Sequence, residues 1–90
     1  PPIYQQALQL MTTDLPAAEK LARRFARQAA GQEAGQQGLA QRLLGHVCLL
    51  RSRHQQALQH YARGIAAFRQ AGDLLEVAIT QSGAAAALIY

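Results

Sequence analysis

The sequence predicts an all-α protein, and three observations support this prediction. The 90 residues are rich in alanine, leucine, glutamine and arginine, which are among the strongest helix formers. Valine, isoleucine and threonine are few, and no stretch alternates polar and apolar residues over the length of a strand. Apolar residues instead recur at helical spacing between short breaks. The length allows one small domain with a thin core.

The first two helices are predicted at 3–12 and from Asp14 to about Gly31. The carboxylate of Asp14 can cap a helix that has Pro16 in its first turn. One helical face of the segment 3–12 collects five apolar residues, namely Ile3, Tyr4, Ala7, Leu8 and Met11. The inner face of the second helix is expected to hold Ala18, Leu21, Ala22, Phe25 and Ala29.

Three more helices follow. The third is predicted to begin within 33–39, where glycines leave its start undefined, and the fourth to span about 54–71. Gly72 then supplies a left-handed stop. Asp73 and Glu76 have the spacing of a capping box, which opens a fifth helix. The short breaks make neighbouring helices antiparallel.

The best-defined unit of the chain runs from Leu39 to Asp73. Small and large residues alternate in it at set spacings, as Leu44-Gly45, Ala57, Tyr61, Gly64 and Phe68. The unit resembles a tetratricopeptide repeat of the longer type, about 40 residues, found in bacterial regulators and signalling scaffolds. Ser52-Arg53 replace the Gly-Asp turn that is common in the family, and the flanking units match less well. A generic α-solenoid or plain helical bundle is the alternative fold.

The resemblance implies antiparallel hairpins stacked as an α-solenoid. Residues 1–32 would form the first hairpin, 33–72 the second, and 73–90 the first helix of an incomplete third, as in a fragment of a longer array. Such arrays hold other proteins, so we expect a protein–protein interaction or assembly scaffold within a larger regulatory or signalling protein. The alternatives are a structural spacer or self-association element, and a basic helical repeat that binds nucleic acid.

The resemblance also implies a partner groove along the first helix of each hairpin. In this sequence the groove positions are Gln6, Arg42, His46 and Leu49. Arg42 is expected to pair with a carboxylate of a protein or peptide partner, while Leu49 receives an apolar side chain. The family's clamp for C-terminal carboxylates needs asparagines, and this chain has none.

Neither an enzyme nor a metal or cofactor site is expected. His46 and Cys48 are two residues apart, so a helix directs them to different faces. His54 and His60 are six apart and are separated in the same way. The chain has no Cys-x-x-Cys pair, and its five acidic residues include no close carboxylate pair.

A basic stripe follows the second helix at i, i+3, i+4 and i+7, formed by Lys20, Arg23, Arg24 and Arg27. The chain has a net charge of +4, which favours acidic partners or phosphates. The stripe also fits a solvated outer face on which Glu19 pairs with Arg23. Nucleic-acid binding is not favoured, because the few aromatic residues fall at core positions.

The fifth helix is predicted to associate with a second copy of itself. Its apolar sides carry Leu75, Ile79, Leu88 and Ile89. A closed two-fold homodimer would cover them. Alternatively, the helix folds back on its neighbours and hides most of this surface.

A cytoplasmic location without membrane contact is expected. The single cysteine forms no internal disulfide, which fits a reducing compartment. No apolar run reaches the roughly 18–20 residues that span a bilayer, and nothing resembles a signal peptide.

Overall fold

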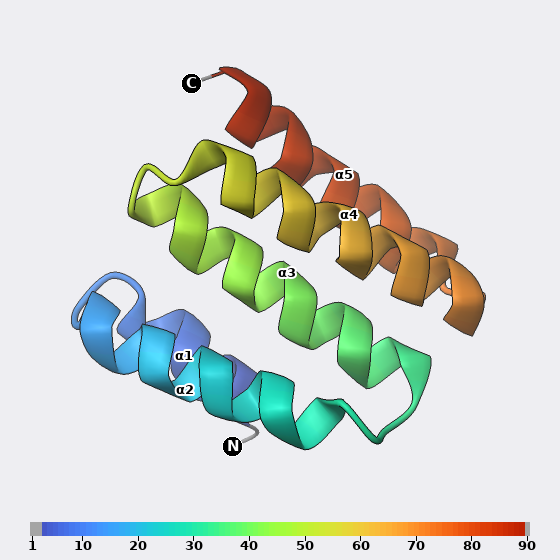
Figure 1. Ribbon diagram of the computed structural model, residues 1–90, viewed down its shortest axis with the longest axis horizontal. Helices are drawn as coiled ribbons and strands as arrows, with labels where there is room; N and C mark the ends of the chain where they lie inside the picture. The colour runs from blue at the N-terminus through green and yellow to red at the C-terminus, as the bar shows by residue number, and fades with distance from the viewer. Residues whose placement is uncertain (1–2, 90) are drawn as a thin grey trace.

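The computed structural model describes residues 3–89, which form five helices and no strand (Figure 1). The helices are α1 (Ile3–Leu10), α2 (Leu15–Ala29), α3 (Ala34–Leu50), α4 (His54–Ala71) and α5 (Leu74–Ile89). The predicted all-α class with five helices is confirmed. The main difference in bounds is that α1 ends at Leu10, because residues 11–13 already form a turn.

Two predicted helix ends form as expected. Asp14 Oδ1 accepts a hydrogen bond from the Ala17 backbone N–H at 3.2 Å, which caps α2. Gly72 ends α4 with φ 75°, and the Asp73 N–H donates to the Phe68 carbonyl at 3.0 Å. This is the closing pattern that favours glycine at the left-handed position.

The turn between α3 and α4 closes in the same way without glycine. Ser52 has φ 60°, and the Arg53 N–H donates to the Cys48 carbonyl at 2.8 Å. A left-handed conformation costs a residue other than glycine about 1–2 kcal/mol. The turn therefore closes as the one at Gly72 does, although Ser52 is an unfavourable residue for the left-handed position.

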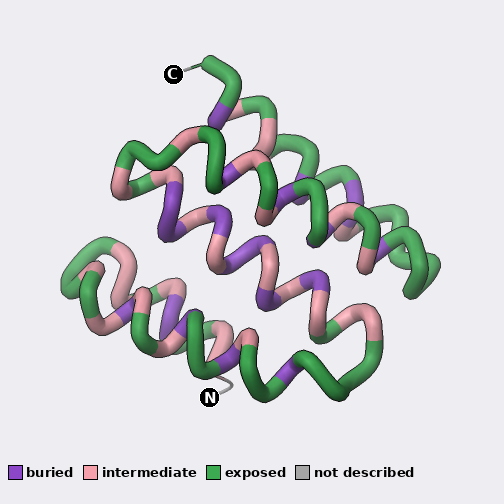
Figure 2. Tube along the Cα trace, in the orientation of Figure 1, coloured by how far each residue is buried: buried purple, intermediate pink, exposed green. Residues whose placement is uncertain are grey.

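The central helix is α3, which contacts all four others (Figure 1). The Cα atoms fill a slab of 33 × 31 × 17 Å, about two helices thick. In the view of Figure 1, α2 and α4 flank α3, and within residues 3–89 these two helices make no close backbone contact with each other. Buried residues recur along the whole of α3 (Figure 2).

The core consists of two clusters joined by α3. Ala57 is fully buried. The cluster of α1, α2 and α3 contains Ala7, Ala22, Phe25, Ala29, Ala40, Leu43 and Val47. The cluster of α3, α4 and α5 contains Cys48, Ala57, Tyr61 and Ala87. Since α3 supplies residues to both clusters, it holds the two halves of the slab together.

Two glycines of α3 receive aromatic rings of α4. A β-carbon at Gly45 would lie 2.6 Å from the Tyr61 ring, and one at Gly38 would lie 2.7 Å from the Phe68 ring. These two glycines thus lie opposite large residues, and the rings fill the space that the missing side chains leave open.

Candidate functional site

The groove position Arg42 is buried at the centre of the molecule. Its guanidinium donates bidentately to the Glu76 carboxylate at 3.2 and 3.3 Å and to the Thr80 hydroxyl at 3.3 Å. It also donates through Nε and Nη2 to the Tyr4 hydroxyl at 3.2 and 3.1 Å. Arg42 was expected to meet a partner's carboxylate. That prediction is wrong about the exposure of Arg42, because the residue is only 5% accessible and already pairs with Glu76 of the same chain.

The surroundings of Arg42 keep it charged. Burial disfavours its charge, but the hydrogen bonds to Glu76 and Tyr4 outweigh this effect and raise the pKa of Arg42. The guanidinium carbon also lies 5.2 Å from the centre of the Phe68 ring and 5.8 Å from that of Tyr4. Arg42 thus links α1, α3, α4 and α5.

His46 lies one turn further along α3 and is also engaged internally. Its Nδ1 is 2.7 Å from the Tyr61 hydroxyl oxygen. Burial, and then the charge of Arg42, lower the pKa of His46 to about 4, so the ring is neutral near pH 7. Burial raises the pKa of Tyr61 to about 12, so its hydroxyl stays protonated. The structure thus places the His46 ring against the core residue Tyr61.

The remaining groove positions are separated from each other. Leu49 is half-buried and packs against the second core cluster. Gln6 is exposed and lies with Leu21 at a shallow hollow between α1 and α2. The structure brings Arg42, His46 and Leu49 together around the α4 rings, while Gln6 lies elsewhere.

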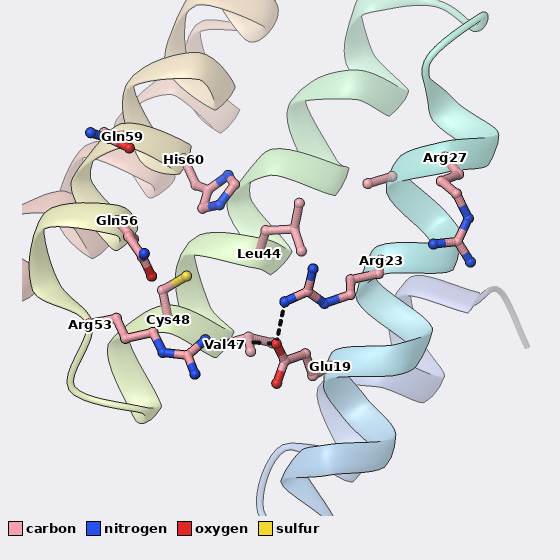
Figure 3. Close-up of a pocket in the computed structure, with 11 residues that line it drawn as sticks. Glu19, Arg23, Arg27, Leu44, Val47, Cys48, Arg53, Gln56, Gln59 and His60 are labelled. Atoms are coloured by element: carbon pink, nitrogen blue, oxygen red, sulfur yellow. Dashed lines mark hydrogen bonds and ion pairs between the residues drawn. The ribbon is translucent and has the colours of Figure 1, made fainter.

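Part of the basic stripe lines a cleft of about 500 Å³ between α2 and α4, with α3 as its floor (Figure 3). All four stripe residues are exposed, but only Arg23 and Arg27 line this α2–α4 cleft; Lys20 and Arg24 do not. Arg53, from the α3–α4 turn, lines the opposite side. The floor includes Leu44, Val47 and Cys48.

Glu19 is the only acidic residue that lines the α2–α4 cleft among residues 3–89. It forms ion pairs of 2.7 Å with Arg23, as predicted, and with Arg51, and lies 3.9 Å from Arg53. The hydrogen bond from Arg23 lowers the pKa of Glu19, and the charges of Arg51 and Arg53 act in the same direction against burial. Basic residues therefore outnumber the carboxylate at this surface.

The side chain of Cys48 is part of the floor of this cleft and is 8% accessible. Burial, first of all, raises the pKa of the Cys48 thiol. In residues 3–89 no three His, Cys, Asp or Glu side chains come together as a metal site would require. In the same part of the chain, no helix combines the length and apolarity needed to cross a membrane.

The outer face of α5 is the main apolar surface of the described chain. Glu76 and Thr80 point inward to Arg42, whereas the large apolar residues point to solvent together with the polar Gln81 and Ser82. These are 46% to 78% exposed and comprise Leu74, Leu75, Ile79, Leu88 and Ile89. Only Leu50 among the other described residues is a large apolar side chain of comparable exposure. The four predicted self-association residues thus lie on the surface.

Sequence reasoning missed the Arg42 network and the α2–α4 cleft. The available signal for the network was Glu76 and Thr80, which are four residues apart in a mostly apolar helix and so share a face. No local pattern connects Tyr4 with Arg42, which are 38 residues apart. The cleft depends on the separation of α2 and α4, which helix periodicity does not specify.

Three features are therefore candidates for a function: the internal network of Arg42, the α2–α4 cleft and the outer face of α5. Comparison with protein-family models, with curated proteins and with solved structures finds no match for this chain.

Proposed function

We propose that this chain is a tetratricopeptide-like assembly module, and that it joins a second copy of itself through the outer face of α5. The exposed apolar face of α5 is the observation that carries the proposal. The experiment that tests it is a measurement of mass against concentration, described below.

The order of contacts supports a repeat arrangement. Successive helices pack on each other, and α3 also contacts α1 and α5, as stacked helix hairpins require. Ser52 adopts the left-handed conformation at the turn where the family commonly has glycine. Gly38 and Gly45 of α3 admit large rings of α4. These features suit a scaffold, in which side chains hold helices together.

The composition of α5 argues that its outer face is normally covered. A surface helix directs polar residues to water and apolar residues inward. In α5, Glu76 and Thr80 face Arg42 inside the molecule, while five large apolar side chains face outward. An exposed side that carries five large apolar side chains beside only Gln81 and Ser82 is typical of a surface that another protein covers.

A second copy is the partner that this face suits best. The exposed side of α5 carries no Lys, Arg, Asp or Glu among its described residues, so two copies bring no like charges together despite the net charge of +4. Covering five side chains on each copy would release on the order of 15 kcal/mol, at about 1.5 kcal/mol each. Association costs about 4–15 kcal/mol. The difference of about 0–11 kcal/mol includes the roughly 4–8 kcal/mol of a dimer that forms between micromolar and millimolar concentration, which is the range to be measured.

Sedimentation equilibrium over this concentration range tests the proposal. The wild-type mass should rise from monomer to dimer. Ile79→Glu and Leu75→Glu should each remain monomeric, because they place a carboxylate in the apolar contact. Circular dichroism checks that both variants keep their helix content.

Gln9→Glu is the matched control, since it adds the same charge at an exposed position of α1. It should dimerise like the wild type. A monomer at every concentration, or equal weakening by Gln9→Glu, would refute self-association through α5. In that case a different protein, or a further helix of an array, would be the partner to seek.

A further inference from the structure

We propose that the α2–α4 cleft binds an acidic segment of a partner protein. This inference concerns a different surface from the outer face of α5 and does not depend on dimerisation. It rests on the shape of the cleft, on its charge and on the way its single carboxylate is used.

The cleft is continuous with a second hollow. Within the described chain α2 and α4 make no close backbone contact, and the space between them stays open above α3. The hollow of about 350 Å³ shares Ala26 with the first and is lined by further small residues, including Ala29, Ala40 and Ala67. The small side chains of these alanines leave room for a peptide backbone between α2 and α4.

Arginines from three parts of the fold line the groove that the cleft and the second hollow form together. Arg23 and Arg27 come from α2, Arg53 from the α3–α4 turn and Arg63 from α4. Against these four cations, Glu19 is the only carboxylate among the described lining residues. A net positive groove attracts acidic segments, and arginine binds carboxylates bidentately.

Glu19 already occupies the place that a partner's carboxylate would take. It accepts from Arg23 at 2.7 Å, while Arg53 is 3.9 Å away, beyond hydrogen-bonding distance. Arg27 and Arg63 form no ion pair within residues 3–89. An incoming acidic segment can therefore bind three arginines directly and compete with Glu19 for the fourth.

The lining favours a protein segment over nucleic acid. Single-stranded nucleic acids bind through aromatic rings that stack on the bases, beside a basic surface. None of the described Phe or Tyr residues lines the cleft or the adjoining hollow, and the one imidazole there, His60, already lies 2.8 Å from the Gln41 side-chain oxygen. Glutamines and Leu44 instead offer the mixed polar and apolar contacts that a peptide uses.

Fluorescence anisotropy with a labelled oligoglutamate peptide tests the proposal, with a single-stranded DNA of equal charge measured in parallel. The double variant Arg23→Gln/Arg27→Gln should weaken peptide binding by about fivefold or more. The matched control is Lys20→Gln/Arg24→Gln, which removes the same charge from the same helix outside the cleft. It should bind within about twofold of the wild type.

Three outcomes would overturn the proposal. Equal losses in the two double variants would indicate diffuse attraction. Tighter binding of the DNA, lost in Arg23→Gln/Arg27→Gln, would indicate a nucleic-acid surface. Weaker peptide binding by Glu19→Gln, with unchanged circular dichroism, would also contradict it, because removing the competing carboxylate should tighten binding. The monomeric variant Leu75→Glu should keep the peptide affinity, which separates this result from that for α5.

Discussion

The ring of Tyr61 in α4 lies against Gly45 of α3, and no side chain fits between them. The same hydroxyl-bearing ring approaches Gly83 of α5, where a β-carbon would lie 3.1 Å from it. Tyr61 therefore fills the crossing of three helices. Its single hydrogen-bonding group is satisfied by His46.

Gly45→Ala is expected to destabilise the protein by about 1–3 kcal/mol, because the new methyl group overlaps the Tyr61 ring. Gly35→Ala provides the control, since nothing lies within 4 Å of a β-carbon there. It should raise stability by up to about 1 kcal/mol through helix propensity. Urea unfolding measures both. Equal effects of the two substitutions would contradict the α3–α4 packing.

Arg42 and Glu76 are expected to be strongly coupled. Glu76→Gln leaves a buried cation without its carboxylate. The substitution should therefore lower the free energy of unfolding more in the wild type than in the Arg42→Met background, where no cation is left. A double-mutant cycle in urea should give a coupling of about 1–3 kcal/mol. A coupling near zero would show that the ion pair contributes nothing to the docking of α5.

The protein is expected to lose stability as the pH falls from about 6.5 to 4. His46 has a native pKa of about 4 and an unfolded value of 6.5. The unfolded state therefore takes up the proton first, which costs up to about 3 kcal/mol of stability by pH 4. Burial lowers the pKa of His60 as well, so His60 adds a slope of the same sign.

Thermal unfolding of the wild type and of His46→Gln between pH 7 and pH 4 measures this effect. Glutamine can bond to Tyr61 but does not titrate, so the variant should lose most of the pH dependence. A wild-type melting temperature that is constant down to pH 4.5 would refute the neutral His46.

Cys48 is expected to react slowly with a thiol reagent in the folded protein. Burial raises its pKa and thus reduces the reactive thiolate, and the side chain is nearly inaccessible. Native labelling should be at least about tenfold slower than labelling in denaturant. A fast native reaction would place the sulfur at an open surface of the α2–α4 cleft.

Much of the helical structure is predictable because its signals are local. Asp14, Gly72 and Asp73 act within one turn of the helix ends that they define, and all three behave as the sequence indicates. The capping box is half formed, however. The Asp73 carboxylate accepts from the Glu76 N–H, but the Glu76 side chain turns to Arg42 instead.

The candidate sites are less predictable because they depend on residues far apart in the chain. A family-like register places Arg42 on a groove, but its exposure depends on Tyr4 and Glu76, which lie 38 and 34 residues away. The basic stripe shows the same limit. Helix periodicity groups Arg23 with Arg24, whereas the packing of α3 and α4 places Arg23 in the cleft and Arg24 outside it. Exposure of the α5 face was foreseeable, since α5 has few polar residues to direct outward.

The bonds of Arg42 also restrict how such a chain can evolve. Its acceptors include side chains of helices before and after it, Tyr4 of α1 and Glu76 of α5. If the segment 33–72 were duplicated or transplanted alone, the copy would carry a cation into a core that lacks both acceptors. Tyr4, Arg42 and Glu76 must therefore change together, although they belong to three different helices.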